Sequence, residues 1–189
     1  MGACRSCYLF NIHILKPHMN ETHPRILVLG VGNILAADEG LGVRCIELLH
    51  ASHAFSDNVA ILDGGTMGML LMGPILDADV LIVADAVLGG GEPGSIYRLT
   101  DQDLPRRLDP GKSPHQADLM DTLVYCEVLG RRPPVVVLGM EPADILSVAC
   151  ELTPPVARRL PDLARLVLRE IEAAGGTCTP LPSQALEAG

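Results

Sequence analysis

The sequence predicts an α/β protein: a three-layer α/β/α sandwich around a mainly parallel, twisted sheet of five strands. Four short runs rich in valine, isoleucine and leucine are continuously apolar, which is typical of strands buried on both faces. Helical patterns separate these runs, as they do in sandwiches of this class. The 189 residues, 48% of them hydrophobic and 20% charged, suit one globular domain with a single core.

The four apolar runs are the expected parallel strands. They begin at Arg25, Val59, Asp79 and Pro134. A weaker pattern at residues 95–99 predicts a fifth strand, antiparallel and at the edge of the sheet. We expect these five segments to form one sheet.

Apolar residues at helical spacing follow the first two runs. The pattern after the first run predicts a surface helix that ends near His53, with a buried stripe of Leu41, Cys45, Leu48 and Leu49. After the second run, residues 66–76 form a methionine-rich segment that we expect to stop or bend near Gly73 and Pro74. Its methionines are interpreted as core residues.

Two further helices are predicted in the second half of the chain. A capping box, Ser113-Pro114-His115-Gln116, opens the first, and Gly130 is expected to end it. Its expected buried stripe is Leu119, Met120, Leu123 and Cys126. The second runs from Thr153 to about Ala174, with a kink expected at Pro161.

The chain is expected to contain one catalytic α/β domain at residues 25–176. Residues 1–24 do not share its pattern and are interpreted as a leader that is disordered or artefactual, with natural translation starting at Met19. Residues 177–189 are polar and aperiodic, and we expect a flexible tail there.

Composition excludes several classes of function. With 14 Lys and Arg against 23 Asp and Glu, the net charge of −9 argues against a nucleic-acid partner. The sequence contains no run of eighteen apolar residues, so no membrane-spanning helix is expected. The six cysteines are scattered and no export signal is convincing, so a cytoplasmic location with reduced thiols is expected. The oligomeric state is not indicated, and a monomer is favoured.

Acidic residues follow all four apolar runs, at the edge where parallel strands place ligands. Asp38 and Glu39 follow the first run, and Asp63, Asp85 and Glu141 end the next three. A bound cation would balance such a ring of charge. Ordinary alternatives stay open, because Asp38 could be an N-cap, Asp63 a turn residue and Glu141 a solvated loop residue. Asp85 is the exception, since it interrupts an apolar run with no turn residue beside it.

His115 is the one histidine that we single out. It lies in the first turn of a predicted helix, where the helix dipole favours a neutral imidazole that can bind a metal. The stretch 101–113 before it is long enough to be a functional loop. A site of carboxylates and one imidazole suits zinc, nickel or another first-row divalent ion.

The segment from Gly30 to Val43, GVGNILAADEGLGV, closely resembles the opening motif of the hydrogenase maturation proteases. The blocks LDGGT at 62–66, IVADA at 82–86 and SPHQ at 113–116 are similar to further motifs of that family, and the resemblance spans Arg25 to Glu172. It implies an endopeptidase that removes a C-terminal peptide from the large-subunit precursor of nickel–iron hydrogenase after nickel insertion. Nickel would then be supplied by the substrate.

The resemblance also implies roles for individual residues. Glu39, Asp85 and His115 would bind the metal, and Asp63 would act near the substrate and its nickel. For peptide cleavage, a metal-activated water and an acid–base pair of carboxylates both stay open. No Ser or Cys nucleophile with an adjacent His is visible, so a covalent acyl-enzyme is not expected. Basic residues in the 101–112 loop, Arg106, Arg107 and Lys112, are candidates for gripping the precursor's tail.

Two other classes of function stay open. A dinucleotide-dependent oxidoreductase would use Gly30 and Gly32 in its phosphate loop and Asp63 as the ribose ligand. However, Leu35 occupies the third glycine position, and the acidic residues after it would repel a pyrophosphate. A nickel-binding maturation chaperone without catalytic activity would use the same three metal-binding residues.

Overall fold

The computed structural model describes residues 23–103 and 114–182, the side chains of 114–117 excepted. Five strands form the central sheet: β1 (Ile26–Val31), β3 (Val59–Gly65), β4 (Val80–Ala86), β5 (Ile96–Thr100) and β6 (Val135–Met140). Their order is β3-β1-β4-β6-β5. β1, β3, β4 and β6 are parallel, and β5 pairs antiparallel with β6. The predicted fold class and the antiparallel edge strand are confirmed.

Burial explains why the apolar runs became strands. Every residue of β1 is buried, and so are all but one each of β4 and β6, because these three strands lie inside the sheet with a layer of helices on each face. β3 has a strand neighbour on one side only and is mostly half-buried. The methyl-rich side chains of the inner strands therefore supply the core on both faces.

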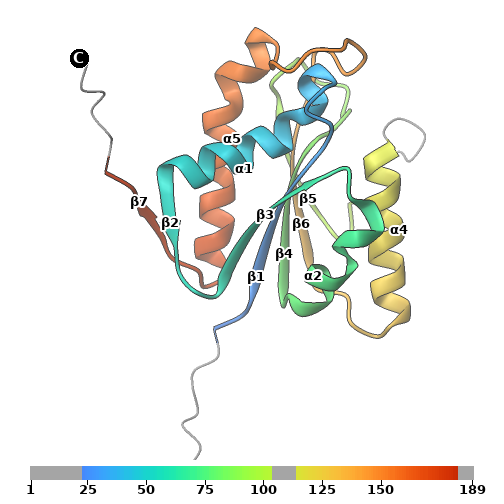
Figure 1. Cartoon of the computed structure of the whole chain (residues 1–189), viewed down its shortest axis with the longest axis vertical. Helices are drawn as coiled ribbons and strands as arrows, with labels where there is room; N and C mark the ends of the chain where they lie inside the picture. The colour runs from blue at the N-terminus through green and yellow to red at the C-terminus, as the bar shows by residue number, and fades with distance from the viewer. Residues whose placement is uncertain (1–22, 104–113, 183–189) are drawn as a thin grey trace, which may run out of the picture.

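Helices cover the two faces of the sheet (Figure 1). α1 (Leu41–Ser52) and α5 (Pro154–Ala173) pack on one face, and α2 (Met72–Asp77) and α4 (Pro114–Val128) pack on the other. The three layers meet in two clusters of buried apolar side chains, one on each side of the sheet. Across the residues that the structure describes, no helix is long and apolar enough to cross a membrane.

The helical stripes lie where the sequence predicts them. Leu119, Leu123 and Cys126 of α4 are buried, and Met120 packs partly against them. After α4, Gly130 takes a positive φ of 77° and ends the helix. The predicted N-cap of α4, Ser113, lies outside the described residues. Pro161 lies inside α5 and does not end it.

The methionine-rich segment differs from its prediction. A short 3-10 turn, η2 (Gly68–Leu71), comes first, and α2 begins at Met72. Pro74 therefore lies in the first turn of α2, where its missing N–H costs nothing, instead of stopping a helix. Met67 and Met69 are exposed, so the expectation that the methionines are core residues is wrong for these two.

A small second sheet joins the C-terminal segment to the residues that follow α1. β2 (His53–Phe55) and β7 (Cys178–Pro180) pair antiparallel, and Leu181 donates its N–H to the carbonyl of Ser52. The expectation of a flexible tail from residue 177 is wrong for these residues, because the exposed backbone of β2 offers them hydrogen-bond partners. Residues 1–22 and 183–189, which include the rest of the expected leader and tail, lie outside the described part of the chain.

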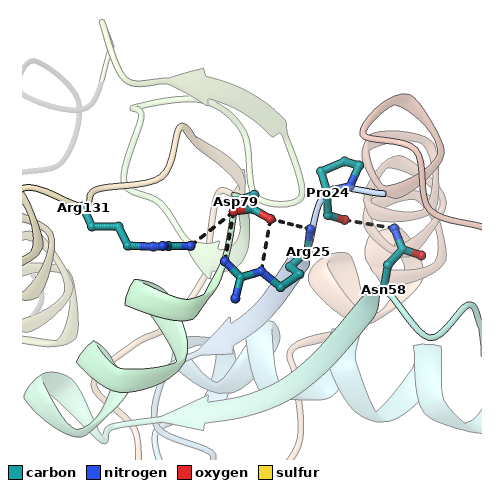
Figure 2. A network of polar contacts seen from close by, with 5 residues as sticks. All are labelled: Pro24, Arg25, Asn58, Asp79 and Arg131. Carbon is teal, nitrogen blue, oxygen red and sulfur yellow. Dashed lines mark hydrogen bonds and ion pairs between the residues drawn. The ribbon is translucent and has the colours of Figure 1, made fainter. Parts of the chain in front are cut away.

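A polar cluster lies at the edge where the parallel strands start (Figure 2). The carboxylate of Asp79 accepts hydrogen bonds from the backbone N–H and the guanidinium of Arg25, at 2.9 to 3.1 Å, and from Arg131 at 3.3 Å. The hydrogen bond from the Arg25 side chain is the main reason why the pKa of Asp79 falls to about 2. Asn58 donates to the carbonyl of Pro24 at 3.0 Å. These contacts connect the segments that immediately precede β1, β3 and β4.

Candidate active site at the carboxyl edge of the sheet

The parallel strands bring two of the predicted site residues to one edge. Asp63 of β3 pairs with Gly30 of β1, and Gly30 pairs on its other side with Ala84 of β4. The next residue of β4, Asp85, pairs with Gly139 of β6. Asp63 and Asp85 therefore end strands that flank β1, on the same edge of the sheet.

Glycines bring Glu39 to this edge as well. Glu39 lies in a 3-10 turn, η1 (Ala37–Gly40), between β1 and α1, and its side chain is partly buried. A Cβ on Gly32 would lie 1.8 Å from the carbonyl oxygen of Glu39, and one on Gly42 would lie 2.2 Å from the carbonyl oxygen of Ala84. Only glycines permit these approaches. The turn that carries Glu39 therefore sits against the ends of β1 and of β4, the strand that carries Asp85.

Asp85 is a buried carboxylate, with 2% of its surface exposed. Its Oδ1 accepts a hydrogen bond from the backbone N–H of Ala86 at 2.8 Å. A Cβ on the neighbouring Gly139 would clash with the side chain of Val87 at 2.4 Å. The glycine thus lets the chain beyond β4 fold closely over β6, which encloses Asp85.

Asp63 is exposed at the end of the edge strand β3. Its Oδ1 accepts a hydrogen bond from the N–H of Gly65 at 2.9 Å, and Gly65 has a positive φ of 41°. The turn interpretation is therefore confirmed for this carboxylate oxygen. The side chain nonetheless remains open to a ligand approaching the carboxyl edge.

His115 is placed by its backbone alone. α4 begins at Pro114, so His115 lies in its first turn as predicted. One turn further on, the side chain of Asp118 lies 3.2 Å from where a Cβ on Gly68 would be, just beyond the end of β3. The start of α4 thus lies toward the carboxyl edge, as Figure 1 also shows.

The side chain of His115 lies outside the described part of the chain, as does the 101–112 loop beyond Asp103. Among the described side chains, no group of three His, Cys, Asp or Glu residues could hold a metal ion. The three-residue metal site of Glu39, Asp85 and His115 therefore stays a prediction. Glu39 and Asp85 bring two oxygen donors to the edge, which is a donor type that first-row divalent ions accept.

Asp38 has a role that the sequence did not reveal. It is completely buried, and it caps neither η1 nor α1. Its carboxylate instead accepts hydrogen bonds from the backbone N–H groups of Ala143, Asp144 and Thr153 and from the Thr153 hydroxyl, at 2.7 to 3.0 Å. The N-cap alternative for Asp38 is therefore wrong. No local pattern could have shown this, because the partners lie more than a hundred residues away.

Glu141 is also a structural residue. It is buried, and its Oε2 accepts hydrogen bonds from the N–H groups of Gly89 and Gly91 and from the Tyr97 hydroxyl, the last at 2.6 Å. The solvated-loop alternative for Glu141 is therefore wrong. These donors hold the β4–β5 connection against the end of β6 and supply hydrogen-bond partners to the Glu141 carboxylate.

Exposed apolar side chains occur on three segments that follow strands at this edge. Leu35 follows β1, Leu70 follows β3, and Leu146 and Val148 follow β6. The last two are 90% and 93% exposed. Their segment is hydrogen-bonded to the Leu35 segment, because Ala149 donates to the carbonyl of Leu35 at 3.1 Å. No pattern in the sequence indicates these residues, because exposure in a loop leaves no periodic signal.

The described cysteines are free thiols. Cys45 and Cys126 are buried, and burial raises the pKa of Cys45 to about 12. A thiol with such a pKa is protonated at neutral pH and is a poor nucleophile. None of these features supports a cysteine-dependent mechanism.

Comparisons of the sequence with known proteins point to one family. The HycI family model, described as hydrogenase maturation protease, matches residues 43–170. A hydrogenase expression/formation protein HupD of Bradyrhizobium diazoefficiens is 45% identical over 151 residues, which are 77% of this chain and 79% of that protein. The hydrogenase 2 maturation protease of Escherichia coli is 38% identical over 157 residues, which are 82% of this chain and 96% of that protein.

A solved structure shows the same fold. The hydrogenase maturating endopeptidase HybD from E. coli superposes with a TM-score of 0.78 and 39% identity, covering 82% of this chain and 97% of that one. Fold and similarity together define the class of the protein as an endopeptidase with an α/β/α sandwich. Within that class, the chain belongs to the hydrogenase maturation protease family. The oxidoreductase alternative is therefore wrong.

Proposed function

We propose that this chain removes the C-terminal extension of the large-subunit precursor of a nickel–iron hydrogenase after nickel has been inserted. Membership of the family supports the proteolytic reaction and the class of substrate. One observation carries the site: the close approach of Gly42 to Ala84, which brings the Glu39 turn over the end of β4 where Asp85 lies.

Recognition of nickel follows from the chemistry of the proposed donors. Two carboxylates and one imidazole, from Glu39, Asp85 and His115, leave further coordination positions on a divalent ion free. Nickel held by the precursor's own ligands could therefore also be bound by this protein. A precursor without nickel lacks that bond and is bound more weakly, so selectivity comes from an added interaction.

Asp63 lies at the neighbouring strand end and is exposed, so it is accessible to a bound precursor. We assign it a role in substrate contact near the nickel. The proposed gripping of the precursor's tail by Arg106 and Arg107 concerns residues outside the described part of the chain, and it rests on their positive charge alone.

The apolar side chains around the edge support a protein substrate over a small molecule. Leu35, Leu146 and Val148 project from two segments that are hydrogen-bonded to each other, one of which leads into the Glu39 turn. When a protein surface covers exposed aliphatic groups, the free energy of the complex falls, because apolar surface is removed from water. We infer that the precursor contacts these side chains while its tail is cut.

Purified protein incubated with nickel-loaded and nickel-free precursor provides the test. We expect the nickel-loaded precursor alone to lose its extension, seen as a shift on a denaturing gel and as a mass difference. Glu39→Ala should abolish cleavage, and Glu127→Ala, which removes an exposed carboxylate on α4, should leave it intact. Equal cleavage of both precursors by the wild-type protein would contradict the nickel requirement.

The same experiment separates a protease from a nickel-binding chaperone. If the protein binds the loaded precursor and never shortens it, the chaperone interpretation is correct and the proteolytic one is wrong. Calorimetric titration with Ni²⁺ alone, on the wild-type protein and on Glu39→Ala and Asp85→Asn, tests the donors without the precursor. Loss of affinity in both variants supports the proposed ligands, and unchanged affinity contradicts them.

A further inference from the structure

Asp38, the neighbour of Glu39, is a completely buried carboxylate whose two oxygens accept four hydrogen bonds. Its Oδ1 accepts from the Thr153 N–H at 2.7 Å. Its Oδ2 accepts from the Ala143 N–H at 2.8 Å, the Asp144 N–H at 3.0 Å and the Thr153 hydroxyl at 2.8 Å. Hydrogen bonds to an ionised acceptor are among the strong ones in proteins. The carboxylate therefore fastens its own turn firmly to residues 143–153.

Backbone contacts reinforce this connection between the β1–α1 and β6–α5 segments. Ala37 donates to the carbonyl of Ala149 at 2.8 Å, and Asp38 donates to the carbonyl of Asp144 at 3.0 Å. Ala37 holds a positive φ of 47°, which is unusual for a residue with a Cβ. Such a backbone conformation persists only where its surroundings fix it. The turn that carries Glu39 is thus held in place by residues of the β6–α5 segment.

The geometry of the turn relates Asp38 to the direction of Glu39. A 3-10 turn has three residues per turn, so neighbouring side chains leave it about 120° apart. With the Asp38 side chain fixed on residues 143–153, the turn cannot rotate about its axis. The backbone of Glu39 is confined on another side by Gly32, where a Cβ would lie 1.8 Å from the Glu39 carbonyl oxygen. Two separate contacts therefore fix the position from which the Glu39 side chain starts.

We propose that Asp38 is the positioning residue of the site, which orients Glu39 toward the nickel-bearing precursor by fastening the η1 turn to the β6–α5 segment. This inference rests on the proposed function. It assigns Asp38 no contact with nickel or with the scissile peptide. Its effect on cleavage is exerted through the direction of the Glu39 carboxylate.

Asp38→Asn is the primary test, because it keeps the shape of the side chain. One carboxylate oxygen becomes an NH₂ group that faces donors, so at least one hydrogen bond is lost. Loss of a residue that orients a metal ligand typically costs 10- to 100-fold in affinity or activity. We expect about that loss in kcat/KM on the nickel-loaded precursor, and a similar loss of affinity for Ni²⁺ alone, with both measured well below the thermal midpoint.

Asp79→Asn is the matched control. Asp79 also connects two segments, since it accepts hydrogen bonds from Arg25 at 2.9 to 3.1 Å and from Arg131 at 3.3 Å. It lies before β4, at the opposite edge of the sheet from Glu39. We expect this variant to lower the thermal midpoint and to leave kcat/KM and nickel affinity unchanged.

Thr153 supplies a second pair of variants in case Asp38→Asn does not fold. Thr153→Val removes the hydroxyl that donates to Asp38, and Thr153→Ser keeps it. We expect kcat/KM to fall several-fold in the valine variant and to stay near the wild-type value in the serine variant.

The proposal is overturned if Asp38→Asn and Thr153→Val lower only the thermal midpoint, as Asp79→Asn is expected to do, while nickel affinity and kcat/KM stay at wild-type values. Failure of the proposed function is distinguishable, because it shows in the wild-type protein as absence of cleavage and of nickel binding. Absence of both also removes the basis of this inference.

Discussion

Gly42, in the first turn of α1, lies against the carbonyl oxygen of Ala84 in β4 so closely that a Cβ on Gly42 would be 2.2 Å from it. The same Cβ would lie 2.4 Å from the carbonyl oxygen of Val31. Both neighbours are backbone atoms of central strands, which cannot rotate away as a side chain can. The sheet and α1 therefore meet at a point where only a hydrogen atom fits.

Gly42→Ala should destabilise the protein strongly. The methyl group forces α1 away from β1 and β4, and overpacking of this kind costs about 1–3 kcal/mol or more. Urea unfolding followed by circular dichroism measures the change. Gly73→Ala in α2 is the control, because a Cβ there meets nothing within 4 Å, and we expect no loss of stability. Equal midpoints for the two variants would show that the close approach in α1 is not a constraint.

Leu146→Ser should weaken recognition of the precursor while leaving the fold intact. Leu146 is 90% exposed, so the substitution removes no core contact. If the precursor covers this side chain, the lost apolar contact is worth about 1.4 kcal/mol, or a tenfold rise in KM. Val128→Ser, at the end of α4, is the control, since that side chain is also exposed. An unchanged KM for Leu146→Ser would exclude this contact.

The ion pair between Arg25 and Asp79 should stabilise the fold less at low pH. The pKa of Asp79 is lowered from its ordinary value of 3.8 to about 2, chiefly by the side chain of Arg25. A carboxyl with a depressed pKa stabilises the fold above its unfolded pKa, and that contribution is lost as the pH falls through about 2. Asp79→Asn should lower the thermal midpoint slightly at pH 6, because both side chains are about half exposed and solvent weakens the pair.

The difference in thermal midpoint between the wild-type protein and Asp79→Asn should shrink between pH 4 and pH 2. Thermal melts followed by circular dichroism across that range measure it. A difference that stays constant down to pH 2 would mean that the carboxylate of Asp79 does not contribute through its charge.

The cysteines should differ in reactivity. Burial raises the pKa of Cys45 to about 12, so its thiol is both shielded and protonated at pH 8, whereas Cys150 is exposed. Iodoacetamide labelling read by peptide mass spectrometry should modify Cys150 in the native protein and Cys45 only after denaturation. Rapid native labelling of Cys45 would show that α1 opens readily from the sheet.

The main architecture could be predicted because it depends on local pattern. The continuously apolar runs before Gly30, Asp85 and Gly139 have no polar face, so they fit only strands with helices on both sides. The stripe from Leu119 to Cys126 has the spacing of one helix face. These features need no knowledge of distant partners.

The structural features that the sequence does not predict depend on contacts between residues far apart in the chain. His53 was expected in a helix, but β2 forms there because Cys178–Pro180 returns to pair with it. Asp38 looks like a helix cap until residues 143–153 supply its donors. For the site, the shared edge of Asp63 and Asp85 followed from strand direction, whereas the exposure of Leu146 depends on how its loop folds.

The contact between Arg25, Asp79 and Arg131 lies where the parallel strands begin, and the proposed chemistry lies where they end. Substitutions far apart in a protein generally change stability independently of each other. Thermal stability and substrate selectivity can thus change independently: the edge where the strands begin can acquire new ion pairs while the edge where they end adapts to a different precursor. For protein engineering, the edge around Asp79 is the place for substitutions that raise thermal stability without changing substrate selectivity.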